Sequence, residues 1–490
     1  MSEQTIYKNF IDSKTGSKIP VLKNDKTIES KYNPEKEAEN IINQITQSFK
    51  YFIVIGIGSG ITLSLLNQKF PKAKIIGIEY SESDIQFLLQ NESLQKLQIN
   101  SNIKLITAES VFSTIQNTYL PVIDGNIRII ENKAWVNENK ISYQIIAKEI
   151  NRTLKNIGSD YSVQCHFGKI WLKNALKNLK LISKIKNKPF NIDLEKKAMI
   201  IAAGPTLEDH ISYLKENKDN FFIISTDTAY KSLLKYNILS NAVVSIDGQF
   251  ISSTHFSKIN NQSSETIFFI DICGNSSVCK KITSINNNLY LFSSKNPLST
   301  FSEQYFNSKP LSLESGSGTV TISALDLAVK LGFKKIEILG ADFSYSKGKT
   351  YTKGTYLEEN FSINQNKLNP LELNYDKLLY RTELQEKTKK VFTTDILESY
   401  KTSLLEYFRQ NNLSYLYEDN IYKLENENEN KYTFSNQFFN YKLFLSELNY
   451  NKTVIPLLPF MAFLKNKEEN KDKTFEELCI IAHNQLLRYN

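Results

Sequence analysis

The 490-residue sequence predicts an α/β protein with a parallel sheet in each of its first two domains and a helical carboxyl-terminal region. Three observations lead to this class. Short β-branched runs alternate with helix-like segments, several runs are apolar at every position, and glycine-rich turns follow them. Strands that are apolar on both faces need helices on both sides of their sheet. The length suggests several domains, and we place their limits at residues 1–190, 191–355 and 356–490.

Composition argues against several classes of protein. Hydrophobic residues make up 41% and charged residues 23% of the chain, which is a globular and not a disordered balance. The net charge of +8 comes from scattered lysines, so it does not indicate nucleic-acid binding. No apolar core of a secretory signal is present near Met1, and the run from 454 to 464 is too short to span a bilayer. We therefore expect a cytoplasmic protein without membrane segments.

The four cysteines are widely spaced, and the closest pair, Cys273 and Cys279, is six residues apart. This spacing fits neither a disulfide framework nor a CxxC metal site. We expect reduced structural thiols and no metal centre.

The first domain contains the order strand, glycine-rich turn, helix, strand and acid. Tyr51–Ile55 is the first predicted strand, Lys74–Ile78 is the second, and a turn with three glycines follows the first. This is the order of a Rossmann-like nucleotide-binding βαβ unit, in which glycines let the backbone approach a ligand and the acid accepts ribose hydroxyls. The candidate ligand residues of this domain are Gly56, Gly58, Gly60 and Glu79.

Two other interpretations of the first domain remain open. The turn also resembles the first motif of S-adenosylmethionine-dependent methyltransferases, although Val54 stands where those enzymes usually carry an acid. The alternative is a structural Rossmann-like half with a vestigial or unknown ligand.

The second domain is predicted to be a doubly wound parallel sheet that binds a nucleotide. Its ligand site should lie just after the strands, because ligands of open α/β sheets bind outside the carboxyl ends of the strands. The predicted strands are Ala198–Ala202, Phe221–Ser225, Ala242–Ile246, Thr266–Ile270, Leu289–Phe292 and Lys335–Leu339.

The first three of these strands are followed by turn residues and acids. Gly204 permits a tight turn, Pro205 fixes a first helical turn, and Thr206 could cap free N–H groups or bind a phosphate oxygen. Asp227 and Asp247 end the next two strands. Two acids at consecutive strand ends favour hydrogen bonds to sugar hydroxyls or a metal site, whereas a single one would usually be a helix cap.

A run of small residues precedes a predicted helix, Val320–Leu331, which Gly332 ends. Such a run forms an anion-binding nest for a phosphate or a sugar carboxylate, and it lacks the lysine of a Walker loop. The last strand then delivers Gly340, Asp342 and Tyr345 to the same edge of the sheet. The residues of the nest are Ser315, Gly316, Ser317, Gly318 and Thr319.

Together these motifs carry a resemblance. The series Ala-Gly-Pro-Thr-Leu, Asp-Thr-Ala, Ile-Asp-Gly, Ser-Gly-Ser-Gly-Thr-Val and Gly-Ala-Asp-Phe-Ser-Tyr, in this order over about 150 residues, resembles the central domain of the motility-associated-factor family. That family glycosylates flagellin, and its central domain is related to bacterial sialyltransferases. The family also has a Rossmann-like first domain and a helical last region.

The resemblance implies a glycosyltransferase that moves pseudaminic or legionaminic acid from its CMP-activated form to Ser/Thr hydroxyls of flagellin, as flagellar assembly and motility require. It implies no cofactor, and flagellin and the CMP-nonulosonic acid as partners. By it, Gly204, Pro205, Thr206 and Asp227 would lie at CMP. The nest and residues 342–345 would face the phosphate and the nonulosonic acid.

The sequence departs from the family in the catalytic residues. Related sialyltransferases carry a histidine downstream of the motif that contains Asp342, whereas the next histidine here is His483. The candidate catalytic residues are therefore Asp342 and Asp247, with His255 third.

Two alternative functions are open. One is a Mg²⁺-dependent pyrophosphokinase of the pterin type, for which Asp227 and Asp247 would begin a carboxylate cluster. The other is a non-catalytic flagellin-binding protein built on a degenerate transferase.

Overall fold

The computed structural model describes residues 4–187, 190, 192–285, 288–316, 318–346, 348–363, 365–388, 391–428, 432, 435–449 and 454–489. The chain forms two compact units. The first comprises Met1–His166 and Met461–Leu478, and the second comprises Phe167–Phe460 and Cys479–Asn490. Within the described ranges, no helix is both long and apolar enough to cross a membrane.

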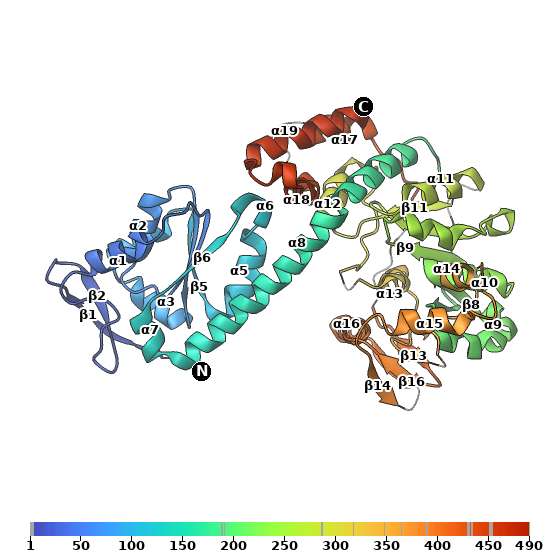
Figure 1. The fold of residues 1–490 in the computed structure, drawn as a ribbon, viewed down its shortest axis with the longest axis horizontal. Coiled ribbons are helices and arrows are strands. Elements are labelled where there is room, and N and C mark those ends of the chain that lie inside the picture. Colours follow the sequence, from blue (N-terminus) through green and yellow to red (C-terminus); the bar gives the residue numbers. More distant parts are fainter. Residues whose placement is uncertain are drawn as a thin grey trace. The chain divides into compact units, whose positions relative to one another are not determined.

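The first unit is built on a parallel sheet with the order β5-β4-β3-β6. The predicted strand Tyr51–Ile55 is β3, and every one of its residues is buried. Helices α1 and α2 lie to one side of the sheet and α5 lies to the other (Figure 1). The Rossmann-like prediction is confirmed. The elements are β1 (Tyr7–Asp12), β2 (Lys18–Leu22), α1 (Pro34–Asn43), β3, α2 (Ile61–Lys69), β4 (Lys74–Glu79), α3 (Glu82–Leu88), α4 (Glu92–Gln98), β5 (Ile103–Thr107), α5 (Val111–Thr118), α6 (Pro121–Asp124), β6 (Ile127–Glu131), α7 (Lys133–Glu138) and the start of α8 (Lys140–Ile182).

The second unit contains an eight-stranded sheet with the order β11-β10-β9-β8-β7-β12-β17-β16. The six strands from β11 to β12 are parallel, as predicted, and β17 and β16 are antiparallel additions. The elements up to β12 are β7 (Lys197–Ile201), α9 (Ile211–Asn217), β8 (Phe221–Thr226), α10 (Asp227–Lys235), β9 (Ala242–Ser245), β10 (Ile267–Asp271), α11 (Ser276–Ile285), β11 (Leu289–Phe292), α12 (Pro297–Ser302), α13 (Val320–Leu331) and β12 (Lys335–Leu339).

Alternate residues of β7 face two different hydrophobic cores. Ala198 and Ile200 pack in the core that α13 contributes to. Met199 and Ile201 pack with residues of α9 and α10 in the other. Figure 1 shows α13 on one side of the sheet and α9 and α10 on the other. This double covering is the reason that the strands are apolar on both faces.

The chain after residue 355 is mainly helical, as predicted, and short strands lie between its helices. One of these strands, β17, pairs with β12, so the β16–β17 hairpin extends the sheet of the second unit. The hairpin was missed because β16 is exposed throughout and carries no apolar alternation. The elements after β12 are β13 (Tyr345–Ser346), α14 (Tyr356–Ile363), α15 (Leu371–Leu379), β14 (Gln385–Thr388), β15 (Val391–Thr393), α16 (Asp395–Gln410), β16 (Ser414–Glu418), β17 (Ile421–Glu425), α17 (Tyr441–Leu448), α18 (Leu458–Lys465) and α19 (Phe475–Leu486).

The chain segments that leave β7 and β12 touch each other at two glycines. The Gly204 N–H donates to the Gly340 carbonyl at 2.8 Å. A Cβ on Gly340 would lie 2.4 Å from the Ala202 carbonyl oxygen, and a Cβ on Gly204 would lie 2.5 Å from the Gly340 oxygen. Glycine at both positions therefore allows the two strand ends to meet.

We expect Gly340→Ala to lower the free energy of unfolding of the second unit by at least about 3 kcal/mol, because the added Cβ meets backbone. Gly348→Ala is a matched control. Both glycines have similar positive φ values, +68° and +69°, but a Cβ on Gly348 would meet nothing within 4 Å. The control should cost only about 1–2 kcal/mol of backbone strain. Urea denaturation measures both, and equal losses would show that the close approach is unimportant.

Candidate functional site

A pocket of about 300 Å³ opens at the carboxyl ends of β7, β8 and β12. This is the edge at which parallel sheets bind ligands. Residues that follow each strand line it, together with the start of α13 and two residues of α16. The lining residues are Ala202, Ala203, Gly204, Thr226, Thr228, Gly318, Thr319, Val320, Thr321, Gly340, Ala341, Asp342, Phe343, Ser344, Tyr345, Thr350, Tyr351, Leu397 and Tyr400.

Asp342 holds the turn after β7. Its carboxylate accepts hydrogen bonds from the backbone N–H of Thr206, at 2.8 Å, and from the Thr206 hydroxyl. Pro205 begins a short 3-10 helix, as its fixed φ predicts, but Thr206 gives that helix no side-chain cap. Burial raises the pKa of Asp342, although the hydrogen bonds from Thr206 oppose the shift. Thr206 therefore orients Asp342 instead of capping free N–H groups.

Asp227 does not reach the pocket. Its side chain is only 2% exposed, and its carboxylate accepts hydrogen bonds from the Ser245 hydroxyl at 2.6 Å and from Thr228 N–H at 2.7 Å. Both carboxylate oxygens of Asp227 are thus engaged by protein donors, and its contact with a ligand stays a prediction. Its neighbours Thr226 and Thr228 line the pocket instead.

Asp247 is not part of the lining of this pocket. It accepts a hydrogen bond from Gln249 N–H at 2.8 Å. Burial raises its pKa, and the charge of Asp227 adds to the shift. His255 is near enough to Asp247 to lower its pKa, and the His255 ring packs edge-on against Tyr356 at 4.9 Å. The two candidate catalytic acids, Asp342 and Asp247, thus do not share one wall of the pocket.

The predicted nest divides into two parts. Gly318 and Thr319 line the pocket, and Thr319 caps α13 by accepting a hydrogen bond from Thr321 N–H at 3.3 Å. Ser315 donates to the Ser294 carbonyl and Gly316 donates to the Glu314 carboxylate, so neither lines the pocket. Ser317 lies outside the described residues.

Tyr345, which the sequence predicts as a site residue, lines the pocket. Burial raises its pKa, and the phenol is protonated at neutral pH.

Other residues of the site were not predicted from the sequence. Tyr400 and Leu397 come from α16 and reach the pocket through tertiary packing alone. His210 is near enough to Asp342 to lower its pKa, and its position six residues after Gly204 was the only available signal. Among the described residues, no group of three His, Cys, Asp or Glu side chains could hold a metal ion.

Comparison with known proteins places the chain in a family. Residues 169–348 match the family model described as 6-hydroxymethylpterin diphosphokinase MptE-like. A protein of Treponema pallidum (strain Nichols), described as uncharacterized, is 32% identical over 188 residues, which are 38% of this chain and 84% of that protein. The chain belongs to the same family as this treponemal protein. A second uncharacterized protein of that organism is 33% identical over 141 residues, 28% of this chain and half of its own length.

A solved structure resembles the whole chain. It is the MAf glycosyltransferase from Magnetospirillum magneticum AMB-1, with a TM-score of 0.52 and 12% identity, and the match covers 99% of this chain and 91% of that one. The resemblance to the motility-associated-factor family that the motif series predicts is thereby confirmed at the level of the fold.

The glycine turn of the first unit is enclosed by protein groups. Glu79 is fully buried, and its carboxylate accepts hydrogen bonds from the Tyr7 hydroxyl at 3.0 Å, Ile57 N–H at 2.7 Å and the Trp135 indole N–H at 3.0 Å. The Trp135 ring also covers Gly56, where a Cβ would lie 2.7 Å from it. The hydrogen bonds of Glu79 therefore go to the chain itself, and its contact with ribose hydroxyls stays a prediction.

A second carboxylate occupies the turn. Glu29 accepts hydrogen bonds from Ser59 N–H at 3.0 Å and from the Ser59 hydroxyl at 2.7 Å, and a Cβ on Gly58 would lie 2.7 Å from it. Gly60 begins α2 in a left-handed conformation without a side-chain cap. A cavity of about 860 Å³ lies beside Glu29 and is also lined by Gly56.

We expect the first unit to lose stability between pH 5 and 8. Burial raises the pKa of Glu79 to about 8 and that of Glu29 to about 7. The folded unit therefore binds more protons than the unfolded chain in this range. Its stability is fully present below the unfolded pKa and falls as pH rises through the folded pKa, by at most about 1.4 kcal/mol per pH unit and group.

Trp135 fluorescence in a Trp171→Phe background reports this unfolding, because the chain has two tryptophans. Glu79→Gln should flatten the pH dependence, and Glu92→Gln, at an exposed position of α4, should keep it. Stability that rises from pH 5 to 8 would contradict the assignment.

Proposed function

We propose that the chain is a glycosyltransferase that moves a nonulosonic acid, pseudaminic or legionaminic acid, from its CMP-activated form to Ser/Thr hydroxyls of flagellin. One observation carries the proposal. The pocket joins the turn after β7, the start of α13 and the segment after β12, which are the places where the motif series puts its ligand residues. The fold of the MAf glycosyltransferase supports a transferase of this general kind.

The pocket suits an anionic, hydroxyl-rich donor. Five threonines line it, and their hydroxyls can bond phosphate or sugar oxygens: Thr226, Thr228, Thr319, Thr321 and Thr350. The start of α13 adds backbone N–H groups and the positive end of a helix of 12 residues, which favours a phosphate or a carboxylate.

Asp342 is the one carboxylate in the described lining of the pocket, which makes it our choice of general base. In the transfer, the acceptor oxygen bonds to the anomeric carbon while the bond from that carbon to the CMP phosphate oxygen breaks. The acceptor proton passes to Asp342, and the electron pair leaves with CMP. Tyr345, whose raised pKa keeps the phenol protonated, can donate to the departing phosphate. Asp247 lies outside the lining, so we give it no role in the proton transfer.

CMP should raise the melting temperature of the chain. A ligand at about 100 times its Kd adds roughly 2.7 kcal/mol to the stability of the native state, which corresponds to a shift of a few degrees. Differential scanning fluorimetry with CMP, CTP and a CMP-nonulosonic acid measures the shift. No shift with any cytidine compound would reject the proposed donor.

Asp342→Asn should lower glycosylation of flagellin by about 100-fold or more, because general bases contribute roughly 10²–10⁴ to rates. Intact-mass analysis of flagellin after reaction with a CMP-nonulosonic acid measures the transfer. Thr206→Val is the matched control, since it removes the hydroxyl that bonds Asp342 but keeps the carboxylate. If Asp342 acts only by closing the turn, both variants should lose the same activity.

A second candidate is supported by the family model. Residues 169–348 match the description of a pterin diphosphokinase, whose chemistry would need Mg²⁺. Stabilisation by ATP with Mg²⁺ but not by cytidine nucleotides, together with pyrophosphorylation of 6-hydroxymethylpterin, would favour this function. A chain that binds flagellin without single-turnover transfer would instead support the non-catalytic alternative.

A further inference from the structure

One wall of the pocket is formed by a chain segment that follows β12 and contacts the segment that leaves β7 and the helix α10. We name residues 344–359 the strap, of which all but Lys347 are described. Tyr345, Thr350 and Tyr351 of the strap line the pocket. Thr352 N–H donates to the Ala203 carbonyl at 2.9 Å, so the strap also contacts the segment that leaves β7.

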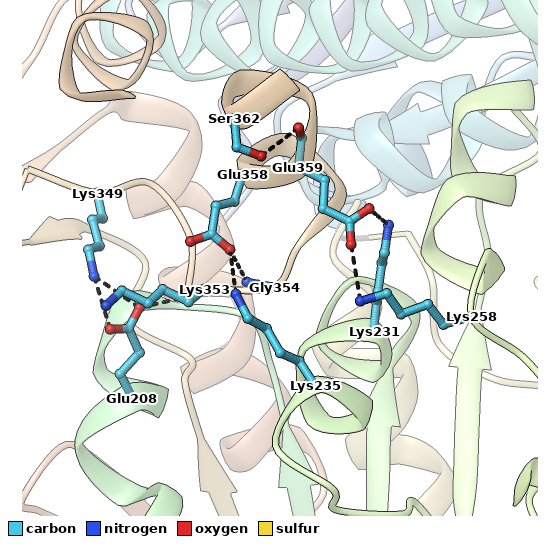
Figure 2. A network of polar contacts seen from close by, with 10 residues as sticks. All are labelled: Glu208, Lys231, Lys235, Lys258, Lys349, Lys353, Gly354, Glu358, Glu359 and Ser362. Carbon is cyan, nitrogen blue, oxygen red and sulfur yellow. Dashed lines mark hydrogen bonds and ion pairs between the residues drawn. The ribbon is translucent and has the colours of Figure 1, made fainter. Parts of the chain in front are cut away.

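The strap is attached at one point to Glu208, in the short helix after β7. The Lys349 ammonium lies 2.9 and 3.1 Å from the two Glu208 carboxylate oxygens. Lys353 N–H donates to the same carboxylate at 2.9 Å. Glu208 thus holds two positions of the strap (Figure 2).

The second attachment joins the end of the strap to α10. Figure 2 shows Glu358 and Glu359 facing lysines of α10. Lys235 lies 3.2 Å from Glu358, and Glu359 pairs with both Lys231 and Lys258. The Lys231 side chain is only 3% exposed, whereas that of Glu359 is 40% exposed. Gly354, with φ +91°, lets the backbone pass α10, since a Cβ there would lie 3.1 Å from the Ser232 Cα.

These attachments are mainly ionic and polar. The larger apolar side chains of the strap are Tyr345, Tyr351, Tyr356 and Leu357, and all four stay partly or largely exposed. The strap therefore buries little apolar surface of the kind that fixes a core segment. The Lys349–Glu208 and Lys235–Glu358 pairs are partly exposed, and such pairs add little net stability and weaken with salt. The pair of the buried Lys231 with Glu359 is therefore the attachment that most opposes opening of the strap.

Three buried threonines of the strap differ in what they face. Thr350 is 5% exposed, Thr352 0% and Thr355 1%, and among the described residues none of the three hydroxyls has a hydrogen-bond partner. Thr350 lines the pocket, and Thr352 and Thr355 do not. An unpartnered buried hydroxyl is unfavourable, and a ligand in the pocket would supply the partner for Thr350.

We propose that the strap is a lid that opens by breaking its lysine–glutamate pairs to admit the ligand, and that Thr350 hydrogen-bonds the ligand when the lid closes. This deepens the proposed function, since it concerns the same pocket, but it does not require the ligand to be a CMP-sugar. The pocket volume of about 300 Å³ is at the low end of the roughly 300–1,000 Å³ that enclose drug-sized ligands. A nucleotide-activated nine-carbon sugar therefore needs an open strap to enter.

Limited trypsin digestion of the full chain tests the opening without any ligand. Mass spectrometry identifies the peptides cut after Lys349 and Lys353, both of which are in the strap. Cleavage there should speed up with added salt, and Glu359→Gln should speed it up roughly tenfold, because the variant leaves Lys231 buried without its partner.

Glu303→Gln is the control for digestion, since Glu303 pairs in the same unit with Lys309, at 3.1 Å, which is not a lysine of the strap. Its strap peptides should appear at the parent rate. If the rate of cleavage in the strap does not depend on salt and is unchanged in Glu359→Gln, the proposal that the strap opens as a lid is overturned.

Thr350→Val tests the ligand contact. It removes an unpartnered buried hydroxyl and keeps the shape, so the unliganded chain should melt at the same or a higher temperature. The affinity for the probe, measured by calorimetry with CMP and separately with ATP and Mg²⁺, should fall about tenfold, and Thr350→Ser should restore it. A structural role alone would move both quantities in the same direction.

Thr352→Val is the matched control for binding, because Thr352 is equally buried but lies outside the pocket lining. It should leave the affinity unchanged. Equal affinities of Thr350→Val and the parent for the probe would overturn the role of Thr350. Failure of the parent to bind both CMP and ATP with Mg²⁺ would overturn it as well. Binding of ATP with Mg²⁺ but not of CMP would reject the proposed donor. The affinities of the variants for ATP would then still test the role of Thr350 in the strap.

Discussion

The meeting of β7 and β12 at two glycines is the constraint on which the candidate site depends. Because neither Gly204 nor Gly340 has a side chain, the two segments approach closely enough for the Gly204 N–H to bond the Gly340 carbonyl. That approach brings Asp342 within reach of both donors of Thr206. The pocket, the orientation of its carboxylate and the start of the strap all follow from this one backbone contact.

The elements of the parallel sheets could be predicted because their signals are local. Leu289–Phe292 and Lys335–Leu339 match the observed strands at both ends, and α13 matches Val320–Leu331, since a capping threonine precedes it and Gly332 ends it. Thr319 and Asp342 could be predicted as site residues for the same reason. They follow directly on a recognisable element.

The rest of the site depends on contacts between residues that are far apart in the chain. Tyr400 reaches the pocket from α16. In the first unit, Tyr7 and Trp135 both donate hydrogen bonds to the Glu79 carboxylate, although one precedes it by 72 residues and the other follows it by 56. The hydrogen bond from Ser245 to Asp227 could not be predicted, because an acid at a strand end has the same local sequence whether it faces solvent or Ser245. The pairing of β17 with β12 has no local signal in the sequence either. Which strand pairs with the edge of the parallel sheet depends on tertiary packing.

The carboxylate of Glu29 in the glycine turn links two segments that are 30 residues apart. Turns of this type usually obtain their anion from a bound phosphate, and the native state then depends on the concentration of that compound. Here the acceptor is a carboxyl group of the chain itself, so its effective concentration is fixed by the intervening segment. The Ser59 amide should consequently resist hydrogen exchange in the unliganded protein.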